Sequence, residues 1–499
     1  MAAGSAVSRG QGGFSAKGAA PVSDLTPRQL AVRDAAERGA ANFDRWRKLN
    51  RYFHDEDARY LRFLIPPHLR VLELGCAAGD LLASLAPSVG IGMDFSPAMI
   101  ALARKRHPGL EFRLGNVEDP VAIAGLGPSA FDIILLSDTI GTLEDIQQSF
   151  EQLHSLCGPD TRIVVSFYSQ LWEPIVRLAE WANLKMPTPL QNWMSSGDIE
   201  AFLDLAGFET IKRAWRQILP KRLFGIGPIV NRCLGSLPLL RRLAVRNYLV
   251  LRSRRVPVAA PTSVSVIVPC RNERGNIEAV VRRLPNIAGQ QEIVFVEGHS
   301  SDGTLEEIHR VKSLFTARDI KILVQDGHGK GDAVRKGFEA ANGDILMILD
   351  ADLTTPPESL PKFFRALATG QCEFVSGTRL VYPLEEQAMR LLNLAANQAF
   401  AAIFTFLLDQ RTTDTLCGTK ALARRHYRRI ANGRGYFGDL DPFGDFDLIF
   451  GAAKLNLKSA EIPIRYAARR YGETQISRFR HGWLLLRMAI LAWWKLKAI

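Results

Sequence analysis

Short apolar runs rich in β-branched residues alternate with helical segments along this 499-residue chain, and the alternation occurs twice. The first series predicts strands at residues 71–74, 90–93, 111–114, 131–136 and 162–168. The second series predicts strands at residues 264–268, 292–296, 320–324 and 345–349. Strands that are separated by helices form parallel, doubly wound sheets. We therefore expect an α/β protein that is built from two doubly wound domains.

The break between the two series falls at residues 254–263, RRVPVAAPTS, where charge, proline and alanine cluster. We expect this stretch to link a domain at residues 26–253 to a second domain at residues 264–499. Residues 1–25 are rich in Ala, Gly and Ser and lack an apolar core, which predicts a disordered leader and no signal peptide. The cytoplasm is therefore the expected compartment. The six cysteines form no C-x-x-C pair, which disfavours a zinc site or a disulfide framework.

The formal net charge of +12 is concentrated in one segment, because residues 211–255 hold twelve Lys and Arg and no acidic residue. Its basic residues are interleaved with apolar ones, as in an interfacial helix on an anionic membrane. A basic linker helix packed on its own domain is the alternative. Contact with nucleic acid is disfavoured, since aromatic residues are sparse and no nucleic-acid motif is present.

Two further segments suit a membrane surface. Residues 391–408 predict a helix without charge, on which Asn393 and Asn397 share one face. The C-terminal sequence WLLLRMAILAWWKLKAI is apolar, amphipathic and interrupted by Arg487. Both fall short of a secure transmembrane helix, which needs about 20 predominantly apolar residues. We expect peripheral contact with the inner face of a membrane.

The first ligand motif follows the strand at residues 71–74, where small residues from Gly75 to Gly79 let the backbone approach a ligand closely. The next strand ends at Asp94, where a carboxylate can accept hydrogen bonds from both ribose hydroxyls. A dinucleotide-binding dehydrogenase would need G-x-G-x-x-G, which this loop does not supply.

VLELGCAAGDLL followed by GIGMDFSPAMIALARKR resembles class I S-adenosylmethionine-dependent methyltransferases, over roughly residues 50–220. The resemblance implies a Rossmann-like fold and S-adenosyl-L-methionine as cofactor. Ala77 stands where many members have Gly, and Asn116 stands where Asp is common. His54, Asp138 and His154 are candidate bases, although a structural role is the alternative for each. The cofactor contacts that the resemblance implies are Glu73, Gly75, Gly79, Asp94, Asn116 and Val117.

The second ligand motif is a buried strand at residues 345–349 that ends in Asp350 and Asp352. Open α/β sheets bind ligands at the carboxyl ends of their strands. Mg²⁺ or Mn²⁺ takes carboxylate oxygens and leaves positions for phosphate oxygens. Asp350-Ala351-Asp352 is therefore expected to hold a metal and a diphosphate. Lys330, between Gly329 and Gly331, is suited to the same diphosphate.

Three motifs of the second half occur in order within about 90 residues: SVSVIVPCRNERGNIEAVV, EIVFVEGHSSDGT and GHGKGDAVRKGFEAANGDILMILDADLTTPPE. They resemble family 2 glycosyltransferases of the GT-A fold, close to dolichol-phosphate mannose synthase, over residues 262–499. By analogy Pro269, Arg271, Glu273 and Glu297 hold the nucleoside of a nucleoside-diphosphate sugar. Glu297 is followed by Gly298, where this branch often has two aspartates.

Basic residues in the second half predict a phosphorylated acceptor, because arginine pairs bidentately with phosphate oxygens. In the resembled branch that acceptor is a polyprenyl phosphate. Solvated or ion-paired surface arginines are the alternative. Asp414 is expected to orient the acceptor, so the expected catalytic groups are Asp350, Asp352, Asp414 and Arg379. The expected acceptor-phosphate contacts are Arg379, Arg390, Lys420 and Arg469.

These features predict a glycosyltransferase for a polyprenyl phosphate, fused to a methyltransferase. Two alternatives remain. The N-terminal half could be a binding module without catalysis, and the transferase could use a soluble hydroxyl acceptor.

Overall fold

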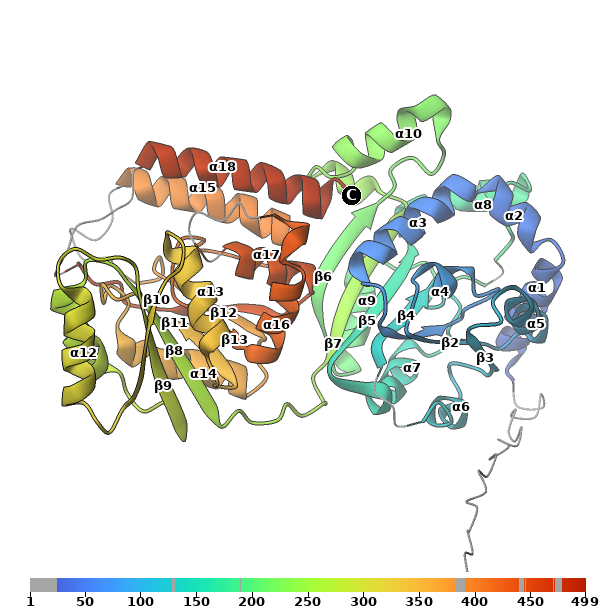
Figure 1. Cartoon of the computed structure of the whole chain (residues 1–499). Coiled ribbons are helices and arrows are strands. Elements are labelled where there is room, and N and C mark those ends of the chain that lie inside the picture. Colours follow the sequence, from blue (N-terminus) through green and yellow to red (C-terminus); the bar gives the residue numbers. More distant parts are fainter. Residues whose placement is uncertain are drawn as a thin grey trace, which may run out of the picture.

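The computed structural model describes residues 25–127, 131–188, 190–382, 391–438, 444, 446–469, 471 and 478–499. Residues 1–24 of the predicted leader and the predicted acceptor contact Arg390 lie outside this part. The chain forms two α/β units, each around one seven-stranded sheet (Figure 1). Among the described residues, no helix combines the length and apolarity that crossing a bilayer requires.

The N-terminal sheet has the order β3-β2-β1-β4-β5-β7-β6. Both of its faces are buried, because alternate residues of β4 belong to two different hydrophobic clusters, Ile133 and Leu135 in one, Ile134 and Leu136 in the other. The strands are β1 Arg70–Leu74, β2 Val89–Asp94, β3 Glu111–Leu114, β4 Phe131–Ser137, β5 Cys157–Tyr168, β6 Phe208–Arg216 and β7 Arg246–Ser253. The helices are α1 Pro27–Ala40, α2 Phe43–Leu49, α3 Arg51–Leu64, α4 Asp80–Ser84, α5 Pro97–Arg106, α6 Pro120–Ala124, α7 Ile146–Leu153, α8 Glu173–Trp181, α9 Ser196–Leu205 and α10 Ile226–Ile229.

The C-terminal sheet has the order β10-β9-β8-β11-β13-β12-β14. Its strands are β8 Ser263–Cys270, β9 Gln290–Glu297, β10 Asp319–Val324, β11 Ile345–Ile348, β12 Phe374–Thr378, β13 Lys420–Ala423 and β14 Ser459–Pro463. Its helices are α11 Ile277–Arg283, α12 Thr304–Leu314, α13 Lys330–Ala340, α14 Leu360–Ala368, α15 Leu391–Leu408, α16 Arg424–Asn432, α17 Phe446–Lys454 and α18 Arg478–Ala492.

The expected α/β class is confirmed, but neither sheet is purely parallel. β7 runs antiparallel to both β5 and β6, and β13 runs antiparallel to both β11 and β12. Antiparallel neighbours need no helical crossover, so these strands lack the strand–helix alternation on which the parallel prediction was based.

The prediction of one interfacial helix within the basic segment 211–255 is wrong. Most of β6 and all of β7 lie in this segment, and its only helical parts are α10 and short turns around it. Lys212 and Arg246 are buried in the sheet. Arg246 is held there by carboxylates from distant elements, Asp57 on α3 and Asp138 after β4. The segment therefore divides into core strands and an exposed loop with a short helix.

The two units pack directly against each other. One hydrophobic cluster runs from Tyr60 and Phe63 of α3 to Tyr427 of α16 and Leu496 near the C-terminus. Across the same boundary, Arg162 on β5 forms a buried ion pair with Glu373, at 2.6 Å. The interface thus resembles a protein core with polar anchors.

Two candidate active sites

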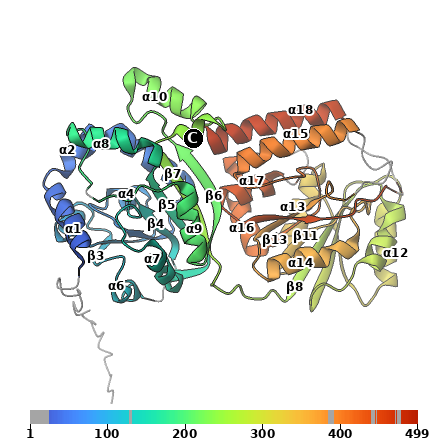
Figure 2. The same cartoon turned by 180° about the vertical axis from the view of Figure 1, so that it is seen from behind.

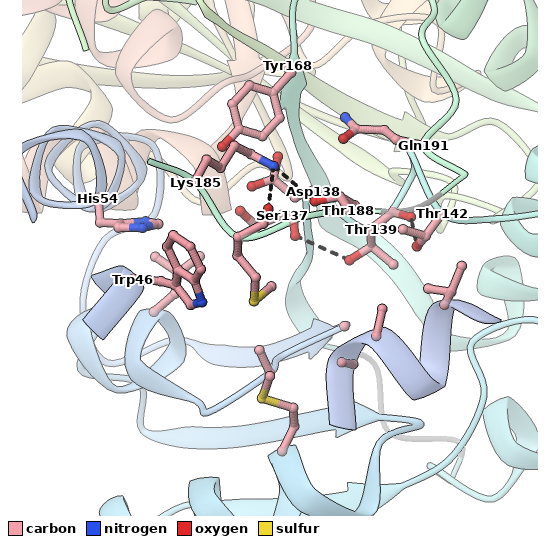
Figure 3. A pocket seen from close by; sticks show the side chains of 18 of the residues that line it. Trp46, His54, Ser137, Asp138, Thr139, Thr142, Tyr168, Lys185, Thr188 and Gln191 are labelled. Atoms are coloured by element: carbon pink, nitrogen blue, oxygen red, sulfur yellow. Dashed lines mark hydrogen bonds between the residues drawn. The ribbon is translucent and has the colours of Figure 1, made fainter. Parts of the chain in front are cut away.

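A cavity of about 560 Å³ opens at the carboxyl ends of β1, β2 and β4 (Figure 3). Asp94 ends β2, and its two carboxylate oxygens accept hydrogen bonds from the backbone amides of Ala77 and Ser96, each at 2.9 Å. Burial raises the pKa of Asp94, whereas these amide hydrogen bonds favour its ionised form. Five predicted cofactor contacts line this cavity: Glu73, Gly75, Asp94, Asn116 and Val117.

The loop after β1 takes a left-handed backbone at three positions, with φ of 78° at Gly75, 44° at Ala77 and 76° at Gly79. Gly79 is the sixth predicted contact, but it does not line the cavity. It precedes α4, and a Cβ at this position would approach the ring of Phe112 to 2.5 Å. Its role is therefore to let the loop pass over β3, while Ala77 and its neighbours form the cavity wall.

Glu73 is buried at the base of the cavity and accepts one hydrogen bond, from the backbone amide of Leu82 at 3.1 Å. Burial raises the pKa of Glu73 to about 8, and the nearby carboxylate of Asp94 adds to this shift. The side chain is therefore mainly protonated at neutral pH, and a cation bound beside it would favour its ionisation.

Another part of the cavity wall carries a buried charge network. Arg246 is fully buried and pairs with Asp57 at 3.1 Å and also with Asp138. Asp138 projects into the cavity (Figure 3), with 43% of its side chain exposed, and desolvation there raises its pKa. Sequence reasoning missed Asp57 and Arg246, because their pairing depends on α3 and β7 meeting in space.

The other two candidate bases differ in position. His54 lines the cavity, and burial lowers its pKa to about 4, so its imidazole is neutral at physiological pH. His154 lies outside the cavity, where it stacks on Phe208 at 4.1 Å and contacts the carbonyl of Ala206. His154 is therefore structural.

In the second unit, the two aspartates after β11 each pair with a basic side chain. Asp350 contacts Lys330 at 2.6 Å, and Asp352 contacts Arg469 at 2.8 Å. Burial raises the pKa of Asp350, but the ammonium of Lys330 outweighs it, and the net shift is downward. Arg469 also contacts Glu273 at 3.0 Å. The structure thus brings together side chains from four separate stretches of the chain.

The space around this pair is tight at one point. A Cβ on Gly418 would lie 2.1 Å from Oδ2 of Asp350 and 2.3 Å from Nζ of Lys330. Only glycine fits there without displacing the pair. Sequence reasoning missed Gly418, although the small residues of TLCGTK just before β13 were a signal.

The remaining predicted nucleoside contacts surround the ends of β8 and β9. Pro269 lies in β8, and Arg271 is exposed just after it. Glu297 ends β9, is buried, and accepts a hydrogen bond from the amide of Ser300 at 2.6 Å. Ala351 is buried between the two aspartates.

The predicted acceptor contacts are divided between two places, because Arg469 lies with Asp352 and Glu273, whereas Arg379 pairs with Asp414. The guanidinium of Arg379 donates two hydrogen bonds to Asp414, at 2.6 and 2.8 Å, and its backbone amide donates another at 3.0 Å. Asn397 of α15 also donates to this carboxylate, at 3.0 Å. Burial opposes ionisation of Asp414, but Arg379 outweighs it and lowers the pKa. Lys420 is buried and donates to the carbonyl of Cys417 at 2.5 Å. The side chain of Asn393, on the same helix as Asn397, lies outside the described part.

Comparison with known families supports the division into two units. Residues 44–213 match the family described as "Methyltransferase domain". Residues 265–430 match the family described as "Glycosyl transferase family 2".

Individual relatives match the C-terminal half. A dolichol-phosphate mannosyltransferase of Saccharomyces cerevisiae is 38% identical over 121 residues, which is 23% of this chain and 44% of that protein. An undecaprenyl-phosphate 4-deoxy-4-formamido-L-arabinose transferase of Pseudomonas fluorescens is 26% identical over 224 residues, 44% of this chain and 61% of that protein. The chain thus spans less than two thirds of either relative's length.

Among solved structures, a SAM-dependent methyltransferase of Thermotoga maritima, a possible histamine N-methyltransferase, is similar with a TM-score of 0.35 and 17% identity. The match covers 44% of this chain and 99% of that one. The two family matches show that the chain holds a methyltransferase domain followed by a family 2 glycosyltransferase domain, and each match falls on one of the two sheets.

Proposed function

We propose that the C-terminal domain transfers a sugar from a nucleoside diphosphate to a polyprenyl phosphate, and that the N-terminal domain methylates an acceptor with S-adenosyl-L-methionine. The observation that carries the first part is the pairing of Asp350 with Lys330 and of Asp352 with Arg469. Each of these carboxylates lies at a strand end and pairs with a long basic side chain. A metal can replace the basic side chain at the carboxylate, and the basic side chain can then bind the diphosphate.

The residues present fit a divalent cation. Asp350 and Asp352 supply two carboxylates, and Mg²⁺ or Mn²⁺ binds well through one or two carboxylates plus phosphate oxygens. The metal would neutralise charge on the departing diphosphate. Lys330 is positioned to move from Asp350 to that diphosphate, and Arg469 from Asp352 to an anionic ligand.

The acceptor cluster favours an anion over a hydroxyl. Arg379 is mostly buried, and its charge is compensated by Asp414. A phosphate oxygen is already anionic at neutral pH, so it needs no general base. We propose that Arg379 and Lys420 bind the acceptor phosphate and that Asp414 fixes the orientation of Arg379.

The residues of the N-terminal cavity fit S-adenosyl-L-methionine. Asp94 presents a carboxylate at the end of β2, and Glu73 is a buried carboxyl whose ionised form a cationic ligand would stabilise. When bound, the cofactor supplies an electrophilic methyl group. Asp138 and His54 face the same cavity and can take the proton that a hydroxyl or amine acceptor loses.

A donor panel tests the proposal. Purified protein is mixed with Mg²⁺ or Mn²⁺, undecaprenyl phosphate and labelled GDP-mannose, UDP-glucose or UDP-N-acetylglucosamine, and label in the organic phase is counted. We expect label from one donor with the wild type. Label appearing only in water-soluble products would move the acceptor to a soluble hydroxyl.

The matched variant is Asp352→Ala. It should abolish transfer, because it removes half of the metal site, and it should leave the rise in melting temperature with S-adenosylhomocysteine unchanged, because that site lies in the other domain. Transfer at the wild-type rate would contradict the metal role of Asp352.

A further inference from the structure

Helix α8 is apolar on two faces, and this is unusual for a helix at the surface of a domain. Trp172, just before the helix, and Val176 and Ala179 within it line the cavity. Leu178 and Trp181 point away from it, and Trp181 is 84% exposed. A helix that only closed a cavity against water would carry polar residues on its outer face.

A second segment repeats this arrangement beside α8. Pro220 and Lys221 line the same cavity, while Phe224 next to them is fully exposed and has a φ of 55°. The exposed apolar side chains continue along α10, at Ile226 and Ile229. Two neighbouring walls of one cavity therefore present large apolar side chains to the outside.

The apolar surface extends to the other domain. Figures 1 and 2 show α8, α10, α15 and α18 along the same side of the molecule. We call this side the apolar face. On the C-terminal domain its exposed members are Trp483, Leu486, Ile490 and Trp494.

The two segments that contribute α10 and α18 to the apolar face are positively charged. Neither residues 211–255 nor residues 478–499 contain an acidic residue. The exposed cations of these two segments include Lys221, Arg222, Arg232, Arg242 and Arg487. Apolar side chains with tryptophan, bordered by cations and spread over two domains, complement an anionic bilayer.

We propose that the methyl acceptor is a membrane-resident amphiphile, whose apolar chain enters the cavity from an anionic bilayer between α8 and residues 220–224. The proposal rests on the methyltransferase function proposed above and names the class of its substrate. The polar head of the amphiphile reaches Asp138 and His54, and its chain lies against Trp172, Val176 and Ala179. A soluble polar acceptor would not account for the exposed side chains of Leu178 and Trp181 on α8.

The same face serves the sugar acceptor. α15 packs beside α18, and its Asn397 contacts Asp414, the partner of Arg379. One membrane surface would therefore supply lipid substrates to both domains.

Photo-crosslinking tests the entry of lipid into the cavity. The full chain is bound to vesicles of equal parts phosphatidylcholine and phosphatidylglycerol, which contain a phosphatidylglycerol with a diazirine in its acyl chain. After irradiation, adducts are assigned to residues by fragmentation mass spectrometry. We expect adducts on Trp181 and Phe224, and also on Val176 and Phe53, which line the cavity and are buried from the outside.

Three variants separate surface binding from entry. Leu178→Ser with Trp181→Ser should weaken vesicle binding at least tenfold. Val121→Ser on α6 is the matched control, because Val121 is 76% exposed but lies away from the apolar face, and it should bind like the wild type (Figure 1). Ala179→Phe should remove the adducts inside the cavity and leave vesicle binding unchanged.

Each outcome has one meaning. Adducts confined to exposed residues, in the wild type as in Ala179→Phe, would overturn entry of lipid. Equal loss of vesicle binding in Val121→Ser and in the α8 variant would contradict membrane binding through the apolar face. S-adenosylhomocysteine is tested separately by its effect on the melting temperature. If it has none while adducts form in the cavity, the methyltransferase function fails and the lipid site stands.

Discussion

At the scale of single residues, Glu73 differs from the aspartates of the second site in how its charge is compensated. In the glycosyltransferase domain, Asp350, Asp352 and Asp414 each have a basic partner. In the methyltransferase domain, Glu73 is buried with one backbone hydrogen bond and has no basic partner among the described residues. Its carboxyl is therefore poised to respond to a bound cation.

The raised pKa of Glu73 predicts a pH-dependent stability. Between about pH 4.5, its ordinary value, and about pH 8, the folded state binds more protons here than the unfolded state. The contribution of Glu73 to stability is therefore lost as pH rises through this window. Glu73→Gln lacks this loss, so its melting temperature, relative to the wild type, should rise from pH 5 to pH 8 and then level off.

Scanning calorimetry at several pH values, without cofactor, measures this difference. Glu111→Gln on β3 is the control, because Glu111 is exposed. Its difference from the wild type should vary little with pH. A Glu73→Gln difference that is equally flat would show that Glu73 is ionised in the folded protein.

The placement of these residues was predictable to different degrees. Glu73, Asp94, Asp350 and Asp352 end or adjoin strands whose apolar runs are evident in the sequence, and parallel strands bring their ends to one edge. Arg246 was not predictable. Its burial depends on two carboxylates that are about 110 and 190 residues away in the chain, and no local pattern encodes such a pairing.

At the scale of elements, the strands with long apolar runs were predicted within a few residues, whereas β6, β7, β13 and β14 were missed. β7, Arg246–Ser253, begins with a charge and lies inside a basic segment, so its charge concealed its apolar centre. The prediction of an interfacial helix within residues 211–255 failed for the same reason. A run of basic residues predicts exposed side chains only when no carboxylate from a distant part of the chain pairs with them in the folded protein.

α15 links the apolar face to the acceptor cluster, and this gives a prediction about the helix. Asn397→Leu removes the hydrogen bond to Asp414, and a hydrogen bond to a charged group contributes about 1.5–3 kcal/mol. If binding of the acceptor phosphate depends on the orientation of Arg379, the rate of transfer to undecaprenyl phosphate should fall about tenfold or more. Hydrolysis of the donor should change little.

The adjacent Gln398 provides the matched control, because it is exposed on the same helix. Gln398→Leu should keep lipid-linked transfer near the wild-type rate. Label in the organic phase and free nucleoside diphosphate are counted in the same reactions. An equal loss of both activities in Asn397→Leu would indicate general damage to the domain and contradict a specific role in acceptor binding.

At the scale of the whole molecule, the two domains are joined by buried polar contacts as well as by apolar packing. Arg162 pairs with Glu373, and Arg252 donates to the carbonyls of Gly370 and Gln371. Near the C-terminus, Lys497 and Arg241 share Asp409, which lies directly after α15. A fixed arrangement of the domains keeps the helices of the apolar face in line, which a shared membrane surface requires.

This interface predicts that the chain unfolds in one cooperative transition. S-adenosylhomocysteine should then raise the melting temperature of both domains together, because a ligand of the folded state stabilises the whole cooperative unit. Glu373→Ala leaves the guanidinium of Arg162 buried without its carboxylate, at a cost of about 3–5 kcal/mol. Calorimetry should then show two transitions, and S-adenosylhomocysteine should raise the temperature of only one of them.

The control is Glu358→Ala, which removes an exposed ion pair with Arg283 within one domain, worth about 0–1 kcal/mol, and should keep the single transition. Two transitions in the wild type, or the same behaviour in both variants, would contradict a coupling of the domains through Arg162 and Glu373.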